Sequence, residues 1–250
     1  MVWAWIGALF IGITLGLLGS GGSILTVPML IYIVGEPEKI AIAESLGIVC
    51  AISFFGFLPS AINRKVHWRS ILYFGVPGMA ATYGGAFVAK FVSGKFQLMI
   101  FAVIMLLAAV MMFQDKSHDV NKDSHHHEKW KLILEGLLVG LITGFVGIGG
   151  GFIIVPALVL LSGLPIHLAV GTSLGIISMN SFIGFFKYMD VLAEMNLSIN
   201  WPLVALFSVI GISGSFIGKR AGDFIPRQRL KKGFAVFLVV MSVCIVWINS

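Results

Sequence analysis

The chain has 250 residues, of which 58% are hydrophobic and 11% are charged. This composition excludes an ordinary soluble domain and places the protein in a lipid bilayer, with room for about eight to ten membrane segments. The formal net charge of +6 does not indicate nucleic-acid binding, because the basic residues lie in loops between apolar segments.

The first apolar segment covers residues 2–18 and is predicted to be a retained membrane segment, because it lacks a basic n-region and a small-residue cleavage site. A glycine run at 19–23 and a short apolar segment at 24–34 follow it. Eleven residues of helix rise only about 17 Å, whereas the hydrocarbon core is about 30 Å thick. The two segments are therefore predicted to form a hairpin whose tip lies inside the membrane.

Three more helices are predicted before the middle of the chain, over residues 40–60, 70–90 and 96–113. Pro77 is expected to kink the second of them. Residues 114–131 are markedly polar and are predicted to be a linker around the triplet His125–His127. The triplet is interpreted as part of a solvated loop, because no other well-spaced metal ligands accompany it.

From residue 132 the same order of segments returns. An apolar segment leads to a second glycine run at 147–151 and to a short segment that ends at Leu161. Helices are then predicted over residues 166–186, 201–218 and 233–249. A polar loop at 187–200 and a basic loop at 219–232 are expected to join them.

An internal repeat explains this order. At a shift of 128 residues, 17 of the 41 positions in 16–56 are identical in 144–184. Glycines, prolines and serines all align, which a shared apolar bias would not produce. After five extra residues the match resumes at Trp68 and Trp201. We therefore predict two transmembrane repeats, 1–113 and 132–250, joined by the linker 114–131.

The distribution of Lys and Arg predicts how the repeats are oriented. If each glycine hairpin enters and leaves by one face, 13 of these residues lie on one side of the membrane and four on the other. If the hairpin crosses the membrane instead, the division is nine against eight. The positive-inside rule favours the first arrangement, in which the repeats are inverted, the linker is cytoplasmic and both termini lie outside. The predicted fold is thus an all-α integral membrane protein of two inverted four-to-five-segment repeats, each opening with a glycine-broken helical hairpin.

The glycine runs are the candidate binding site. A broken helix exposes backbone N–H groups, and a helix N-terminus favours an anion. Close packing through small residues is the structural alternative. The candidate substrate ligands come from both runs and from the helices that follow them: Gly19, Ser20, Gly21, Gly22, Ser23, Ser45, Gly147, Gly149, Gly150, Gly151, Thr172, Ser173 and Asn180. Ser53, Ser178 and Ser181 lie deeper in the same helices.

Glu44 is the one carboxylate expected inside the hydrocarbon region, which makes it a candidate for proton coupling. Its counterpart in the repeat is the neutral Thr172, and Glu44 could equally reach the interface. An intramembrane hydrolase built on Ser20 is not supported, because no histidine lies within an apolar segment and the counterpart of Ser20 is Ile148. No catalytic residue, metal or cofactor is expected.

The paired motifs G-L-L-G-S-G-G-S-I-L-T-V-P at 16–28 and G-F-V-G-I-G-G-G-F-I-I-V-P at 144–156 resemble those of the TauE/SafE family of sulfite-exporter-type membrane proteins. Each is followed by an S-L-G segment, and the resemblance covers nearly the whole chain. It implies a multi-pass permease of the plasma membrane, in a family associated with the export of sulfite and organosulfonates such as sulfoacetate.

The expected function is therefore secondary transport of small, sulfur-containing anions by alternating access between the two halves, with protons as a candidate coupling ion. The alternatives are a permease for another solute, such as an organic acid or a cation, and a passive anion channel. The expected partners are the lipid bilayer and a small anionic solute, with no nucleic acid. The substrate, the direction of transport and the oligomeric state stay open.

Overall fold

The computed structural model describes residues 2–18, 21–114, 129–147, 149–161, 163–222 and 227–249, and the elements that these residues form are all helical, with no strand among them. Up to residue 114 the elements are α1 (Val2–Leu18), η1 (Gly21–Leu25), α2 (Thr26–Met29), η2 (Leu30–Val34), α3 (Glu38–Ile62), α4 (Trp68–Ser70), η3 (Ile71–Gly75), α5 (Val76–Ala89) and α6 (Gly94–Gln114). From residue 129 they are α7 (Lys129–Val146), α8 (Gly151–Pro156), η4 (Ala157–Leu161), α9 (Ile166–Glu194), α10 (Trp201–Gly222) and α11 (Arg227–Asn249). The triplet His125–His127 lies outside the described residues.

Prolines and glycines shape the helices where the repeat aligns them. The wide turns of η2 and η4 follow Pro28 and Pro156, and η3 lies just before Pro77, where a kink was expected. Proline has no N–H to donate, so the helix has to readjust around it. Gly35 and Gly163, which the repeat also aligns, have φ angles of 88° and 60°, a conformation that only glycine adopts easily.

The predicted loop at 187–200 is wrong over its first part, because α9 continues to Glu194. Tyr188 and Val191 are buried on one side of this extension. On its other side Asp190 is exposed and pairs with Lys187, one turn earlier, at 3.5 Å; the Lys187 side chain itself is only 11% exposed. The extension is therefore amphipathic, and its charged residues cover a buried stripe rather than form a loop. The basic loop at 219–232 is also shorter than predicted, since α10 and α11 extend into it.

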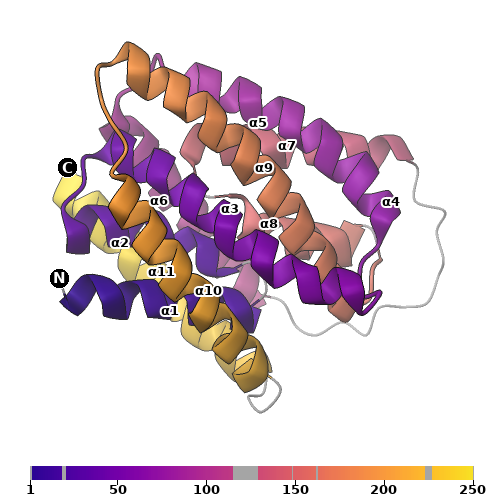
Figure 1. Cartoon of the computed structure of the whole chain (residues 1–250). Coiled ribbons are helices and arrows are strands. Elements are labelled where there is room, and N and C mark those ends of the chain that lie inside the picture. The colour runs from indigo at the N-terminus through magenta and orange to yellow at the C-terminus, as the bar shows by residue number, and fades with distance from the viewer. Residues whose placement is uncertain are drawn as a thin grey trace.

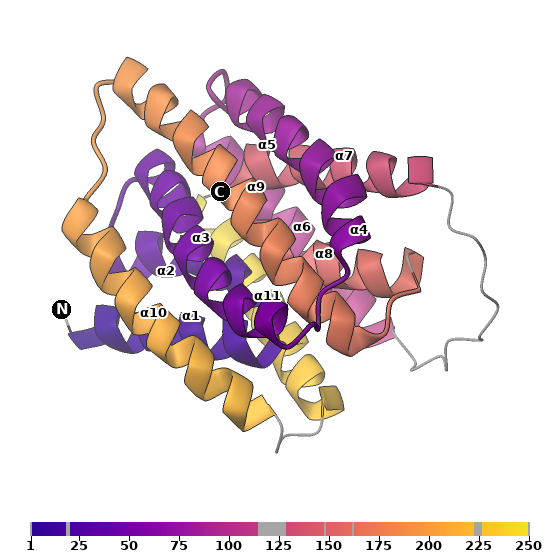
Figure 2. The ribbon, with the colours of Figure 1, turned by 45° about the vertical axis from the view of Figure 1, so that its right-hand side comes forward.

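The long helices pack in a reciprocal pattern. α1 packs along α10, and α7, its counterpart in the repeat, packs along α5, the counterpart of α10. α3 and α9, which are counterparts of one another, cross in the middle, and α6 packs on α11. Figures 1 and 2 show α3 beside α9, with α5 and α7 on one side of them and α1 and α10 on the other.

Glycines bring two of these helix pairs into backbone contact. A Cβ atom at Gly12 of α1 would collide with the carbonyl oxygen of Gly211 in α10. The equivalent Gly140 of α7 would meet the carbonyl oxygen of Gly78 in α5 in the same way. Small residues let membrane helices approach this closely. The same interface is therefore built twice.

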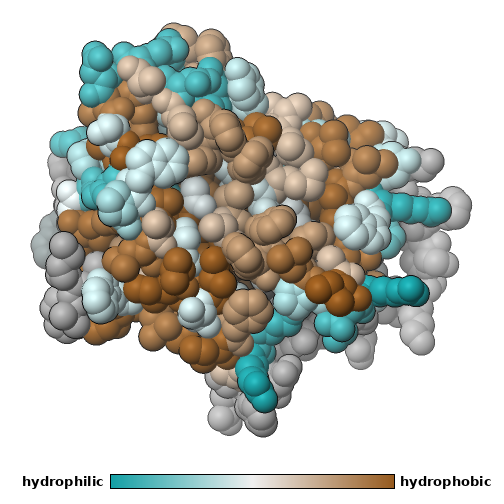
Figure 3. All heavy atoms as spheres, viewed as in Figure 1, coloured by the Kyte–Doolittle hydropathy of each residue, from teal (hydrophilic) through white to brown (hydrophobic). Residues whose placement is uncertain are grey.

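The lengths and the surface of the helices suit a membrane. Among the described residues, four helical stretches are long and apolar enough to cross a bilayer: Glu38–Ile62, Trp68–Ala89, Leu168–Glu194 and Trp201–Ala221. Shorter apolar helices accompany them, including Trp5–Leu17 and Gly94–Val110. On the face drawn in Figure 3, hydrophobic side chains cover the middle, and hydrophilic ones gather mainly at its upper left and lower right.

Candidate functional site

The second glycine run is a break with left-handed backbone. α7 ends at Val146 and α8 begins at Gly151. Between them Gly147, Gly149 and Gly150 have φ angles of 77°, 73° and 66°. Side chains other than glycine are strained in this region, so the sequence of the run is dictated by its conformation.

Hydroxyl groups surround this break. A Cβ atom at Gly149 would lie 2.8 Å from the Oγ atom of Ser181 in α9, and one at Gly150 would collide with Oγ1 of Thr143 in α7. Ser45 of α3 donates a hydrogen bond from Oγ to the carbonyl of Gly147, at 2.7 Å. The glycines are therefore needed for close approach as well as for conformation, and α3, α7 and α9 converge on them.

Several polar groups at the centre are buried without a partner. The hydroxyls of Thr143 and Ser181 accept or donate no hydrogen bond within the described part of the chain, although both residues are fully buried. The same holds for the hydroxyls of Thr26 and Ser53 and for the amide of Asn180. Burying a polar group without a partner is costly, so the hydroxyls of Thr143 and Ser181, which lie beside Gly150 and Gly149, mark a place where a ligand or water supplies the bonds.

The first glycine run has a different conformation. Gly21 and Gly22 begin the tight 3₁₀ turn of η1, while Gly19 and Ser20 lie outside the described residues. A Cβ atom at Gly22 would lie 2.6 Å from the Cα atom of Leu15, the counterpart of Thr143. Ser23 is buried. The first break is therefore packed against the backbone of α1, whereas the second lies against the hydroxyls of Thr143 and Ser181 and the apolar side chains of Ile42 and Val49.

The two breaks meet inside the molecule. η1, which holds Gly21 and Gly22, packs against α8, which begins at Gly151. Both elements also lie against the long helices that follow the breaks, because α8 contacts α9 and α2 contacts α3. The candidate residues of the two runs are thus brought to one region.

Glu44 and Thr172 each accept a hydrogen bond from the backbone just before another helix, rather than from a glycine run. Oε1 of Glu44 accepts a hydrogen bond of 2.8 Å from the backbone N–H of Asn200, just before α10. Oγ1 of Thr172 accepts one of 2.9 Å from the backbone N–H of His67, just before α4. Glu44 and Thr172 are counterparts in the repeat, as are His67 and Asn200, so the same tether occurs twice. Oε2 of Glu44 is buried with no hydrogen-bond partner among the described residues.

The two remaining candidates, Ser173 and Asn180, contact their own helix or the neighbouring helix α5. Ser173 donates from Oγ to the carbonyl of Val170 in its own helix, at 2.8 Å. Asn180 faces α5, where a Cβ atom at Gly78 would lie 3.1 Å from its Nδ2 atom. Neither Thr143 nor Thr26 was among the site residues predicted from the sequence. Thr143 lies directly before Gly144, the first residue of the motif, and only this position could have pointed to it.

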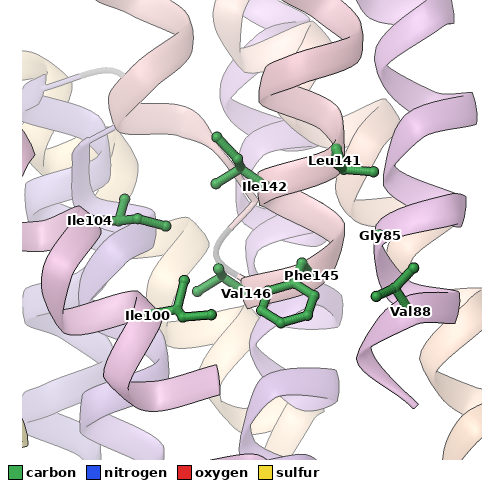
Figure 4. A pocket seen from close by; sticks show the side chains of 8 residues that line it. All are labelled: Gly85, Val88, Ile100, Ile104, Leu141, Ile142, Phe145 and Val146. Atoms are coloured by element: carbon green, nitrogen blue, oxygen red, sulfur yellow. The ribbon is translucent and has the colours of Figure 1, made fainter. Parts of the chain in front are cut away.

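An apolar pocket nearby belongs to the lipid-facing side. It has a volume of about 200 Å³, lies between α5, α6 and α7, and contains no polar side chain (Figure 4). Val88 and Leu141 on its wall are each 47% exposed. Its lining is Gly85, Val88, Ile100, Ile104, Leu141, Ile142, Phe145 and Val146. It offers nothing to bind a charged solute. No group of three His, Cys, Asp or Glu side chains in the described residues could hold a metal ion.

Long apolar helices, a belt of hydrophobic surface and a buried polar centre between broken helices define a multi-pass membrane protein of the transporter class. The sequence matches the family model described as "Sulfite exporter TauE/SafE" over residues 4–245. The chain therefore belongs to the TauE/SafE family, as its motifs predicted, and it is a membrane transporter and not an enzyme.

Relatives over nearly the full length support this assignment. A protein of Xylella fastidiosa (strain Temecula1) named "Probable membrane transporter protein" is 29% identical over 95% of this chain and 91% of its own length. A protein of the same name from Haemophilus influenzae is 30% identical over 93% of this chain and 92% of its own. A probable membrane transporter protein of Methanocaldococcus jannaschii is 27% identical, over 94% and 92%. No solved structure matches the chain.

Proposed function

We propose that this protein is a secondary transporter of small anions, with sulfite and organosulfonates as the first substrates to test, and that the anion binds at the two glycine breaks. The observation that carries the proposal is that the buried hydroxyls of Thr143 and Ser181, which lie against Gly150 and Gly149, have no hydrogen-bond partner in the part of the chain that the structure describes. In a membrane transporter, buried donors without a protein partner are best explained by the solute that passes through. The family name supplies the sulfur-containing class.

An anion suits these groups for a chemical reason. Hydroxyls donate hydrogen bonds, and the first N–H groups of α8, which starts at Gly151, have no partner within the helix. Gly150 is left-handed and Gly151 begins the right-handed helix α8, and such an alternation of hand turns successive backbone N–H groups toward one side, where an anion can lie. Thr143 and Ser181 then complete the binding shell. An anion can thus lose its water inside the membrane and keep its hydrogen bonds.

The reciprocal packing supports the proposed inverted repeats, 1–113 and 132–250. Each hairpin helix packs on the third helix of the other half, α1 on α10 and α7 on α5. In both ribbon views the α3–α4 connection lies at the opposite end of the bundle from the α9–α10 connection (Figures 1 and 2). This agrees with a topology in which loops 61–69 and 219–232 and the linker 114–131 are cytoplasmic and both termini lie outside. Alternating access would then be a movement of one half against the other.

Glu44 is the candidate for coupling to protons. It is fully buried, and its Oε2 atom has no partner among the described residues. Its Oε1 atom accepts a hydrogen bond from the backbone N–H of Asn200, so one of the two carboxylate oxygens has a structural role. The variant Glu44→Gln separates the two roles, because its amide oxygen can still accept from Asn200 but it has no ionisable group.

Flux into proteoliposomes tests the function. Purified protein is reconstituted, and uptake of sulfite, sulfate, thiosulfate, sulfoacetate and acetate is measured with and without a pH gradient, against empty liposomes. We expect saturable uptake of at least one sulfur-containing anion and its stimulation by the gradient. Saturable uptake of only acetate or of a cation would support a permease for another solute. Conductance that neither saturates nor responds to the gradient would support a passive channel.

A further inference from the structure

The carbonyl of Phe145 lies in the last turn of α7, two residues before Gly147. The last carbonyls of a helix have no N–H partner in their own helix. Inside a bilayer they must be satisfied by neighbouring groups. Two side chains reach this one: Gln97 of α6 donates from Nε2, and Tyr188 of α9 donates from its hydroxyl at 3.1 Å. The chain is thus held at the point where it leaves the helix.

The two donors belong to a larger buried network. Nε2 of Gln97 also lies 2.9 Å from the hydroxyl of Tyr188. Oε1 of Gln97 accepts from Nζ of Lys39 in α3, and the same ammonium donates to the carbonyl of Ala89, the last residue of α5. Lys39 is 6% exposed, and Gln97 and Tyr188 are fully buried. The network therefore joins elements from both halves of the chain.

Lys39 determines which way the amide of Gln97 points. An ammonium group only donates hydrogen bonds, so the oxygen of the amide must face Lys39 and its nitrogen must face Phe145. Within the described ranges, Lys39 forms no ion pair with a carboxylate. A buried ammonium without a counter-charge is costly. Orienting the amide of Gln97 is a role that explains why Lys39 is buried at this position.

The repeat has no second copy of this network. At the positions that match Gln97 and Tyr188 the sequence has Leu230 and Ser60, and Leu230 cannot form a hydrogen bond. The network therefore serves the second break alone. At this second break Gly147, Gly149 and Gly150 are left-handed, and the hydroxyls of Thr143 and Ser181 have no partner among the described residues.

We propose that Lys39, Gln97 and Tyr188 are positioning residues that clamp the Phe145 carbonyl and so hold the second glycine break in its binding conformation. The inference rests on the proposed function in one respect, that the second break binds the transported anion. With the clamp, the N–H groups around Gly149 and the hydroxyl of Thr143 are presented in a fixed arrangement. Without it, the break has to be ordered by the anion itself, and affinity falls.

Two measurements on the full chain test the clamp separately from the function. Amide hydrogen exchange of peptides covering 143–152 reports on the break, and proteoliposome uptake gives KM and the maximal rate. The variants are Tyr188→Phe, Gln97→Leu and Lys39→Met, with Lys39→Arg as the conservative variant. Ser242→Ala is the matched control, because it removes one buried side-chain hydrogen bond, to the carbonyl of Ala102, at the α6–α11 interface.

We expect faster exchange at the break and a KM raised about tenfold in Tyr188→Phe and Gln97→Leu, with the maximal rate little changed. Lys39→Arg should restore what Lys39→Met loses, because a guanidinium can donate to both acceptors. Ser242→Ala should leave exchange at the break and KM unchanged. Unchanged exchange at 143–152 in Tyr188→Phe and Gln97→Leu would overturn the clamp. Faster exchange with unchanged KM would keep the clamp and overturn the second break as the binding site.

Discussion

Glu44 and Asn200 are joined by a hydrogen bond of 2.8 Å from the backbone N–H of Asn200 to the Glu44 carboxylate, which ties α3 to the start of α10. Thr172 and His67 repeat this bond at 2.9 Å in front of α4. The donors are main-chain groups, so only an acceptor is required of the side chain in α3 or α9. A carboxylate and a hydroxyl therefore fill the same role at matched positions.

The first prediction separates this tether from coupling at Glu44. In Glu44→Gln the amide oxygen still accepts from Asn200, so we expect uptake down a concentration gradient to be kept. In Glu44→Ala the bond is lost, and we expect less folded protein and less uptake. Thr172→Val should resemble Glu44→Ala, because it removes the matching acceptor.

The pH gradient decides what else Glu44 does. Uptake by Glu44→Gln is measured with and without the gradient. Loss of stimulation in this variant would assign proton coupling to Glu44. Full stimulation would leave Glu44 with the tether alone.

The second prediction concerns the glycines of the breaks. Gly149→Val and Gly150→Val put a β-branched side chain at positive φ and against Ser181 or Thr143, so uptake should be abolished. Replacing Gly21 and Gly22 by valines should do the same, because a side chain at Gly22 would meet the backbone of Leu15.

Membrane insertion of these variants is measured beside uptake. Gly84→Val is the control, because a Cβ atom at Gly84 would have nothing within 4 Å. It should insert and transport like the natural sequence. Unchanged flux in the break variants would refute the proposed site.

The third prediction uses the unpartnered hydroxyls. Ser181→Ala and Thr143→Val each remove a buried polar group that has no hydrogen-bond partner among the described residues. We expect the free energy of unfolding to stay the same or to rise by about 1 kcal/mol, and the KM for the anion to increase. The Ser242→Ala control should show the reverse, with about 1 kcal/mol lost and KM unchanged, since its hydroxyl is bonded to Ala102.

Denaturant titration in detergent and proteoliposome uptake provide the two readouts. A residue that only packs would change stability without changing KM. Such a result for both Ser181 and Thr143 would contradict the assignment of these hydroxyls to the solute.

The fourth prediction tests the duplicated interface. Gly12→Val and Gly140→Val each force apart a helix pair in backbone contact, α1 from α10 and α7 from α5. Each should cost about 1–3 kcal/mol of stability, and the two costs should be similar because the contacts are equivalent. Thermal unfolding in detergent measures them, again with Gly84→Val as control. A large effect of one variant and none of the other would argue against reciprocal packing.

The fifth prediction concerns topology. Reporter fusions in the linker 114–131 and in loop 219–232 should both be active in the cytoplasm, and a fusion in the α9–α10 connection at 195–200 should be active outside. These outcomes follow from the positive-inside rule applied to the inverted arrangement. Reporters in 114–131 and 219–232 on opposite faces would contradict the inversion.

The helical class, the membrane environment and the places where helices break could be read from residue identities. Glycines act through their own backbone chemistry, so the second glycine run could be predicted as a helix break, which the structure contains between α7 and α8. Family membership followed from the same motifs. The sequence prediction ended α9 too early, because its last turns carry charged residues. Their amphipathic pattern is recognisable only once the buried residues beside them, such as Tyr188 and Val191, are known.

The surroundings of the site required the fold itself. Lys39, Gln97 and Tyr188 are far apart in the sequence, yet they form one network: Gln97 and Tyr188 meet at the Phe145 carbonyl, and Lys39 donates to the amide oxygen of Gln97. Apolar surfaces of membrane helices are chemically alike, so a hydrophobic pattern does not say which helix lies beside which. From the sequence alone Glu44 is an isolated charge in the membrane, whereas the structure shows that its carboxylate accepts a hydrogen bond from Asn200. Residue identity set where the chain breaks, and side-chain packing between distant helices set which polar groups surround the break and which are left without a partner.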